Sequence, residues 1–78
     1  MNGYTRHLGE ILKKAGAEPS PENREILDRA VREILGMERA DATEVWAKVK
    51  PILLGDSEKR KEFEDKVARL LIKYLITG

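Results

Sequence analysis

Apolar residues recur at helical spacing in four stretches of this chain, and glycine or proline separates each stretch from the next. At about 3.6 residues per turn, each stretch gathers its apolar side chains on one face, as an amphipathic helix does. No stretch alternates with period two over the length of a strand, so we expect no sheet. The pattern predicts four helices over residues 4–15, 21–35, 42–54 and 57–76. We interpret residues 1–78 as a single domain, an all-α compact bundle of these four amphipathic helices.

The apolar faces differ in width. The face of the second helix covers roughly half its circumference, which indicates a central helix with two neighbours. The residues expected to face the core are Tyr4, Leu8, Ile11, Leu12 and Ala15; Ile26, Leu27, Ala30, Val31, Ile34 and Leu35; Val45, Val49, Ile52 and Leu53; and Phe63, Val67, Leu70, Leu71, Tyr74 and Leu75.

Capping residues support three of the helix starts. Ser20 is an N-cap candidate, and Pro21 suits the first helical position because its missing N–H has no helical partner there. Asp41 opens a stretch with the spacing of a capping box. Asp56 or Ser57 is expected to cap the fourth helix.

Glycines mark the expected helix ends, and one proline lies inside a helix. Gly16, Gly36 and Gly55 follow the first three helices. Pro51 removes a backbone donor within the third helix and predicts a kink there. The connection over residues 36–41 is long enough to include a helical turn of its own.

Length and composition limit how the fold can be stabilised. The chain has 78 residues, a single histidine and no cysteine, so disulfides and zinc–thiolate sites are excluded. A core this small needs regular helix packing or a partner subunit. The 41% of hydrophobic residues argues against disorder. The net charge of +1 lacks the basic excess expected of a non-specific nucleic-acid binder.

No targeting or membrane segment is expected. The apolar run over residues 70–76 is far shorter than the roughly 20 residues of a membrane span. The charged first fifteen residues lack a signal-peptide core, so we predict a soluble, cytoplasmic protein without a membrane partner. The absence of glutamine and the abundance of Glu, Lys and Arg resemble the composition of thermophilic proteins.

The residues required for catalysis are scarce. His7 and Glu10 have i, i+3 spacing, which could supply half of a metal site in a dimer. We interpret His7 instead as a residue flanking the apolar face beside Ile11. Nucleophilic catalysis needs a nucleophile, a base and an orienting group held together, and no such set is apparent. We therefore predict a non-enzymatic protein with no cofactor, metal or small-molecule substrate.

A nucleic-acid-associated accessory or regulatory protein is the alternative. Its candidate contacts are the two basic clusters Lys13-Lys14 and Lys59-Arg60-Lys61. A helix-turn-helix formed by the second and third helices is disfavoured, because two acidic residues occupy the start of the expected recognition helix.

The third helix also carries an aromatic residue close to lysines. Trp46 could stack on a base, and Lys48 and Lys50 could contact phosphates. These lysines lie about 200° apart around the helix, on opposite flanks of its apolar face. We therefore expect Trp46 to pack at the edge of the core.

Most other charges form pairs of opposite sign with i, i+4 spacing, which stabilise exposed helical faces. In the second helix these pairs are Glu25–Arg29, Asp28–Arg32 and Arg29–Glu33. The first helix repeats the pattern at Arg6, Glu10 and Lys14.

The end of the fourth helix carries the main functional prediction. Ile72 and Ile76 point about 180–220° away from Phe63, towards solvent. Either the other helices enclose them, or they form an apolar surface for a homodimer or another protein. The predicted interface residues are Ile72, Ile76, Leu54 and Met37, framed by Arg69 and Lys73.

Overall fold

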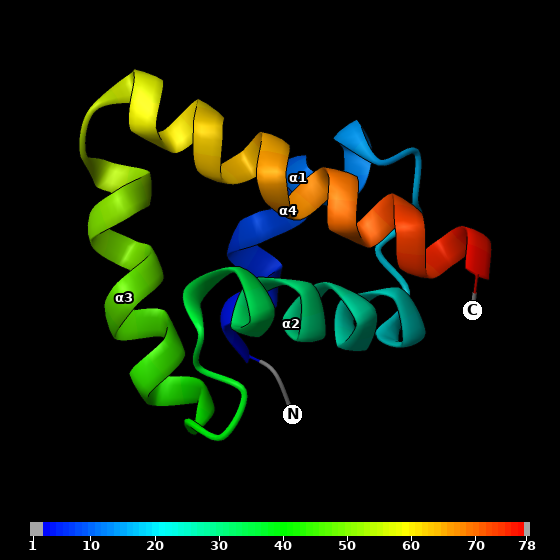
Figure 1. Cartoon of the computed structure of the whole chain (residues 1–78), viewed down its shortest axis with the longest axis horizontal. Coiled ribbons are helices and arrows are strands. Elements are labelled where there is room, and N and C mark those ends of the chain that lie inside the picture. The colour runs from blue at the N-terminus through cyan, green and yellow to red at the C-terminus, as the bar shows by residue number, and fades with distance from the viewer. Residues whose placement is uncertain (1–2, 78) are drawn as a thin grey trace.

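The computed structural model describes residues 3–77, and helices make up most of this range. A 3₁₀-helix, η1 (Gly3–Leu8), leads into α1 (Gly9–Lys14), which is followed by α2 (Pro21–Leu35), α3 (Ala42–Leu54) and α4 (Ser57–Thr77) (Figure 1). These residues contain no strand, and the prediction of a four-helix all-α bundle is confirmed. The observed bounds of α2 and α3 match the predicted ones, and α4 extends one residue further.

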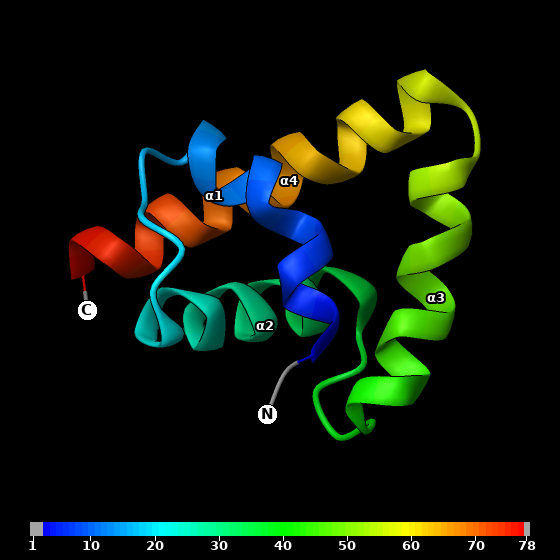
Figure 2. The same cartoon turned by 180° about the vertical axis from the view of Figure 1, so that it is seen from behind.

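Helix α4 is the common packing partner of α1, α2 and α3. It runs antiparallel to α2 and beside it, while α3 crosses one end of this pair (Figure 1). Figure 2 shows α1 on the opposite side of the molecule, where it packs against α4. At 1.5 Å per residue, α4 is about 30 Å long, which equals the longest dimension of the molecule, 30 Å. Helix α2 packs against two neighbours, α4 and η1, as its wide apolar face predicted, while α4 packs against α1, α2 and α3.

The buried core is one cluster with contributions from every helix. Its buried apolar residues are Tyr4, Leu8, Ile11, Leu12, Leu27, Ala30, Val31, Val45, Val49, Phe63, Val67, Ala68 and Leu71. Two residues expected in the core, Ile34 and Leu75, are instead exposed. Both lie within the last turn of a helix, where fewer neighbouring side chains can cover them.

The predicted N-caps are present. The amide of the third helical residue donates to Ser20 Oγ at 3.1 Å in α2 and to Asp41 Oδ1 at 2.9 Å in α3. In α4, Glu58 N donates to Asp56 Oδ1 at 2.9 Å, so Asp56 rather than Ser57 is the cap. Each cap satisfies an amide that has no partner within its own helix.

Two of the three glycines end their helices in the left-handed conformation. Gly16 has φ of 71° and Gly36 has φ of 68°, and backbone bonds of the Schellman type close both helices. The connection over residues 36–41 contains turns but no helical segment. Helix α3 continues through Pro51 to Leu54, so the proline does not end the helix. The bend expected at Pro51 stays a prediction.

The first helix differs from the prediction of a single α-helix over residues 4–15. Residues 3–8 wind as a 3₁₀-helix, and the regular α-helix begins at Gly9. A 3₁₀-helix has about three residues per turn, so side chains three positions apart share a face. Thr5 and Leu8 are accordingly both buried, although the α-helical spacing predicted burial of Leu8 alone.

A polar network connects η1, α2 and the loop before α3. Tyr4 Oη donates to Asp28, whose other carboxylate oxygen accepts from Arg32 Nε at 2.9 Å. Arg32 also donates to the carbonyl of Ala40. Burial raises the pKa of Tyr4, and the hydrogen bond to Asp28 raises it further. The network holds the N-terminal segment against α2 by directional contacts in addition to apolar packing.

Gly55→Ala should lower the free energy of unfolding by about 1–3 kcal/mol, the usual cost of extra volume that forces the backbone to shift. A Cβ atom at Gly55 would lie 2.9 Å from the backbone oxygen of Pro51, so the turn between α3 and α4 would have to shift. Gly9→Ala is the matched control, since a Cβ there meets nothing within 4 Å and φ is negative. Urea unfolding of both variants measures the difference, and equal stabilities would contradict this role of Gly55.

Tyr4→Phe should lower the free energy of unfolding by roughly 1–3 kcal/mol near neutral pH, because Asp28 loses a buried donor. The raised pKa means that the folded chain keeps the Tyr4 proton above pH 10, where the unfolded chain loses it. Stability should therefore decline as the pH rises above 10, and decline less steeply in Tyr4→Phe. Urea unfolding of the parent and of Tyr4→Phe over this pH range provides the test. The same slope in parent and Tyr4→Phe would rule out this source of pH dependence.

Candidate functional site

Three apolar side chains are exposed close together at the end of α4. Ile76 is 78% exposed, Ile72 is 37% exposed and Leu75 is 36% exposed. We refer to Ile72, Leu75 and Ile76 as the C-terminal patch. The exposure of Ile72 and Ile76 agrees with their predicted position on the helix, whereas that of Leu75 does not. The end of α4 lies at one edge of the molecule (Figure 1), and the patch follows Leu71, the last fully buried residue of the helix.

The structure does not bring the other predicted apolar residues to the patch. Leu54 is 76% exposed, but it is the last residue of α3 and lies at the opposite end of α4 from Ile76. Met37 lies in the loop after α2 and is partly buried against the core. Leu54, Met37 and the C-terminal patch therefore do not form one surface.

A row of basic residues lies beside the C-terminal patch. Arg69 and Lys73, predicted to frame the interface, are both exposed, and so is Lys66 one turn before Arg69. We call Lys66, Arg69 and Lys73 the basic stripe. None of the three forms an ion pair with any residue in the range 3–77, so their charges are available to a partner.

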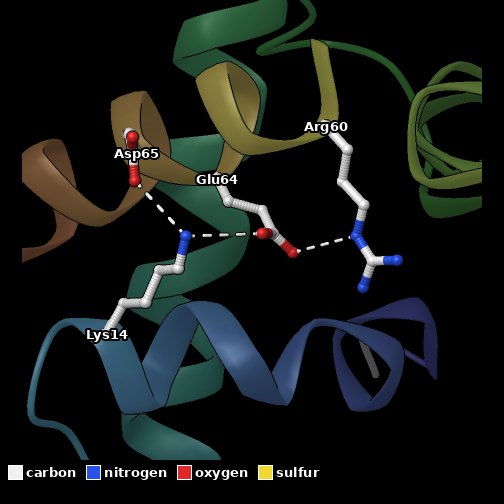
Figure 3. A network of polar contacts seen from close by, with 4 residues as sticks. All are labelled: Lys14, Arg60, Glu64 and Asp65. Atoms are coloured by element: carbon white, nitrogen blue, oxygen red, sulfur yellow. Dashed lines mark hydrogen bonds and ion pairs between the residues drawn. The ribbon is translucent and has the colours of Figure 1, made fainter. Parts of the chain in front are cut away.

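A cluster of charges joins α1 to the first half of α4 (Figure 3). Glu64 is only 8% exposed and lies between two cations. Its Oε1 is 3.5 Å from Lys14 Nζ, and its Oε2 is 3.3 Å from Arg60 Nε. Lys14 Nζ also lies 3.3 Å from Asp65 Oδ1. Burial acts to lower the pKa of Lys14, but the two carboxylates outweigh it and raise the pKa.

This cluster reduces the positive charge that the two predicted basic clusters could present to a nucleic acid. Lys14 and Arg60 approach the same carboxylate, so the two predicted basic clusters do meet. Both cations are already paired with carboxylates, which weakens the electrostatic attraction that they could exert on phosphates. The remaining members, Lys13, Lys59 and Lys61, are exposed. Local spacing cannot indicate this contact, because Lys14 is 50 residues from Glu64 in the chain.

His7 stacks on Trp46, a contact that no local sequence pattern predicts. The ring centroids are 4.9 Å apart and the planes meet at 18°. Trp46 packs partly buried against the core, as predicted for an edge position, whereas Lys48 and Lys50 are exposed. His7 therefore packs against α3. The sequence predicted only that it flanks the apolar face of its own helix beside Ile11. Among residues 3–77, no group of three His, Asp or Glu side chains is arranged to hold a metal ion.

Most charged side chains on the polar face of α2 form ion pairs with one another. The predicted pairs Asp28–Arg32 and Arg29–Glu33 are present at 2.9 and 3.8 Å. Arg29 also lies over the ring of Tyr74, 4.5 Å from its centroid, and Tyr74 donates to Glu33. An open depression of about 400 Å³ is lined by Asp28, Arg29, Arg32, Glu33 and Glu38. Four of these five residues are already paired, so it offers little to a ligand.

None of the helices described in residues 3–77 combines the length and apolarity needed to cross a bilayer.

Glu64→Gln should lower the free energy of unfolding by about 1 kcal/mol, because Lys14 and Arg60 lose the carboxylate between them. This value lies between the effects of exposed and buried pairs, since both cations remain partly exposed. Glu62→Gln, on the exposed side of the same helix, should change stability by less than about 0.5 kcal/mol. Urea unfolding at low ionic strength compares the two variants, and equal effects would contradict a stabilising cluster.

Comparison of the chain with protein-family models, with curated proteins and with solved structures finds no match. A functional interpretation therefore rests on the chemistry of the chain's own surface.

Proposed function

We propose that this chain is a small non-enzymatic interaction module that docks another protein through the C-terminal patch of α4. One observation carries the proposal. Five large apolar side chains are exposed among residues 3–77, and three of them lie between residues 72 and 76. Scattered apolar residues are normal on a protein surface, but a cluster rimmed by charged groups is typical of a binding site.

The helix that carries the patch is packed firmly against the core. Val67 and Leu71, on the inner face of the same helix, are completely buried and fix α4 against its neighbours. A partner would therefore meet side chains on a helix already held in place, which reduces the ordering cost of association. Burial of apolar surface favours association by about 25 cal/mol per Å² before the entropic and desolvation costs of binding are subtracted.

Association with a second copy is the less favoured form of this function. In a twofold-symmetric contact each patch would meet itself. The basic stripe of one copy would then lie close to that of the other, and like charges would oppose the association. A different protein that carries complementary charge avoids this conflict.

The test uses a photoreactive amino acid at Thr77, beside the patch, in cells that express the chain. We expect a crosslinked adduct of one discrete mass in the parent. Ile76→Ser should reduce its yield at least about tenfold, because hot-spot residues of interfaces contribute 2 kcal/mol or more. Isoleucine and serine have similar helix propensities, so the stability of the chain should change little. Leu54→Ser is the matched control, since Leu54 is 76% and Ile76 is 78% exposed.

Three results would contradict the proposal: no adduct, an adduct unaffected by Ile76→Ser, or equal loss in Leu54→Ser. An adduct with the mass of two copies would instead establish self-association and refute the choice of a different protein. Unfolding measurements on the same variants separate loss of contact from loss of structure.

A further inference from the structure

We infer that the partner presents an acidic amphipathic helix, whose apolar side chains cover the C-terminal patch and whose carboxylates meet the basic stripe. This inference rests on the proposed function and specifies the chemistry of its partner.

The acidic residues of α4 are confined to its first half. Residues 58–65 contain four acidic residues, Glu58, Glu62, Glu64 and Asp65, together with the basic residues Lys59, Arg60 and Lys61. Residues 66–77 contain Lys66, Arg69 and Lys73 and no acidic residue. Basic residues near a helix C-terminus interact favourably with the helix dipole, but that effect is confined to the last turn. It does not account for Lys66, which lies near the middle of Ser57–Thr77.

The geometry of the helix makes the stripe and the patch adjacent. At about 100° per residue, the basic stripe falls within an arc of roughly 60°. The C-terminal patch covers the next arc of about 100°, and Arg69 lies about 20° from Ile76. A second helix placed along α4 could therefore contact both rows with one apolar face and one acidic flank. Amphipathic helices commonly dock in this way, with anchors spaced at i, i+3, i+4 and i+7.

The availability of the basic stripe supports this assignment. Lys14 and Arg60 are already paired with Glu64, whereas the basic stripe has no carboxylate partner among residues 3–77. Glu33, at the neighbouring surface of α2, accepts from Tyr74 and lies 3.8 Å from Arg29. A partner that supplies carboxylates would therefore satisfy charges that the fold leaves open.

Other occupants match these features less well. A nucleic acid could neutralise the basic stripe, but its phosphates would leave Ile76 without apolar cover. Recognition of anionic membranes typically uses clusters of about four to eight basic residues, more than the stripe provides. The first half of α4 carries four acidic against three basic residues, so it adds no net positive charge that would attract an anionic membrane lying along the whole helix.

The experiment is a selection from displayed helical peptides with fixed leucines at i, i+3, i+4 and i+7. The flanking positions vary among Glu, Gln and Lys. Selections use the parent, Ile76→Ser, Leu54→Ser, and a triple variant in which Lys66, Arg69 and Lys73 are each changed to Glu. Circular dichroism checks folding, and the single variant Arg69→Glu replaces the triple variant if that chain fails to fold.

We expect the parent to enrich peptides with Glu at the flanking positions and the charge-reversed variant to enrich Lys. The affinity of a selected Glu peptide should fall about tenfold on charge reversal, as expected for the loss of several ion pairs at an interface rim. It should fall at least as much with Ile76→Ser and stay unchanged with Leu54→Ser.

The outcomes separate the inference from the proposed function. Peptides that depend on Ile76 but show no preference for Glu would overturn the acidic partner and leave docking at the patch intact. Failure to select any peptide, or binding unaffected by Ile76→Ser, would overturn both. Vesicles of phosphatidylcholine and phosphatidylserine provide a parallel probe. Stronger Ile76-dependent binding to these vesicles than to the Glu peptide would assign the surface to a membrane and overturn the inference.

Discussion

The buried face of α4 is the contact on which the rest of this structure depends. Val67 and Leu71 are completely buried, and α4 packs against α1, α2 and α3. With no cysteine in the chain, no disulfide shares this role. Since three helices use the inner side of α4, its outer side remains uncovered near the C-terminus. The same packing that stabilises the fold therefore exposes the surface that we propose as its functional site.

Polar contacts determine how the N-terminal segment joins this framework. Tyr4 and Asp28 connect η1 to α2, while Glu64 connects α1 to α4 through Lys14. Buried polar groups need partners, so these contacts favour one orientation of the N-terminal helices over alternatives that would leave such groups unpaired. The charged side chains in these contacts would appear unpaired if only the sequence near each of them were considered.

The distribution of paired and unpaired cations distinguishes the functional alternatives. Lys14 and Arg60, central to the nucleic-acid alternative, lie against carboxylates. Arg69 and Lys73 lie beside exposed isoleucines and have no such partner among residues 3–77. A surface that combines free cations with apolar side chains is better matched by an amphipathic protein segment than by a phosphate backbone.

The sequence by itself determined the features that depend on local geometry. Helical spacing predicted α2 and α3 with their observed bounds, and Ser20 and Asp41 were identifiable as caps because capping involves residues only a few positions apart. The outward position of Ile76 followed from its angle on the helix in the same way.

Only the tertiary structure decided contacts between residues far apart in the chain. The stacking of His7 on Trp46 and the pairing of Lys14 with Glu64 depend on how the helices cross, which no local pattern specifies. The exposure of Leu75 likewise depends on where the neighbouring helices end. A periodic pattern gives the direction of a side chain from its own helix, but its burial is decided by what lies in that direction.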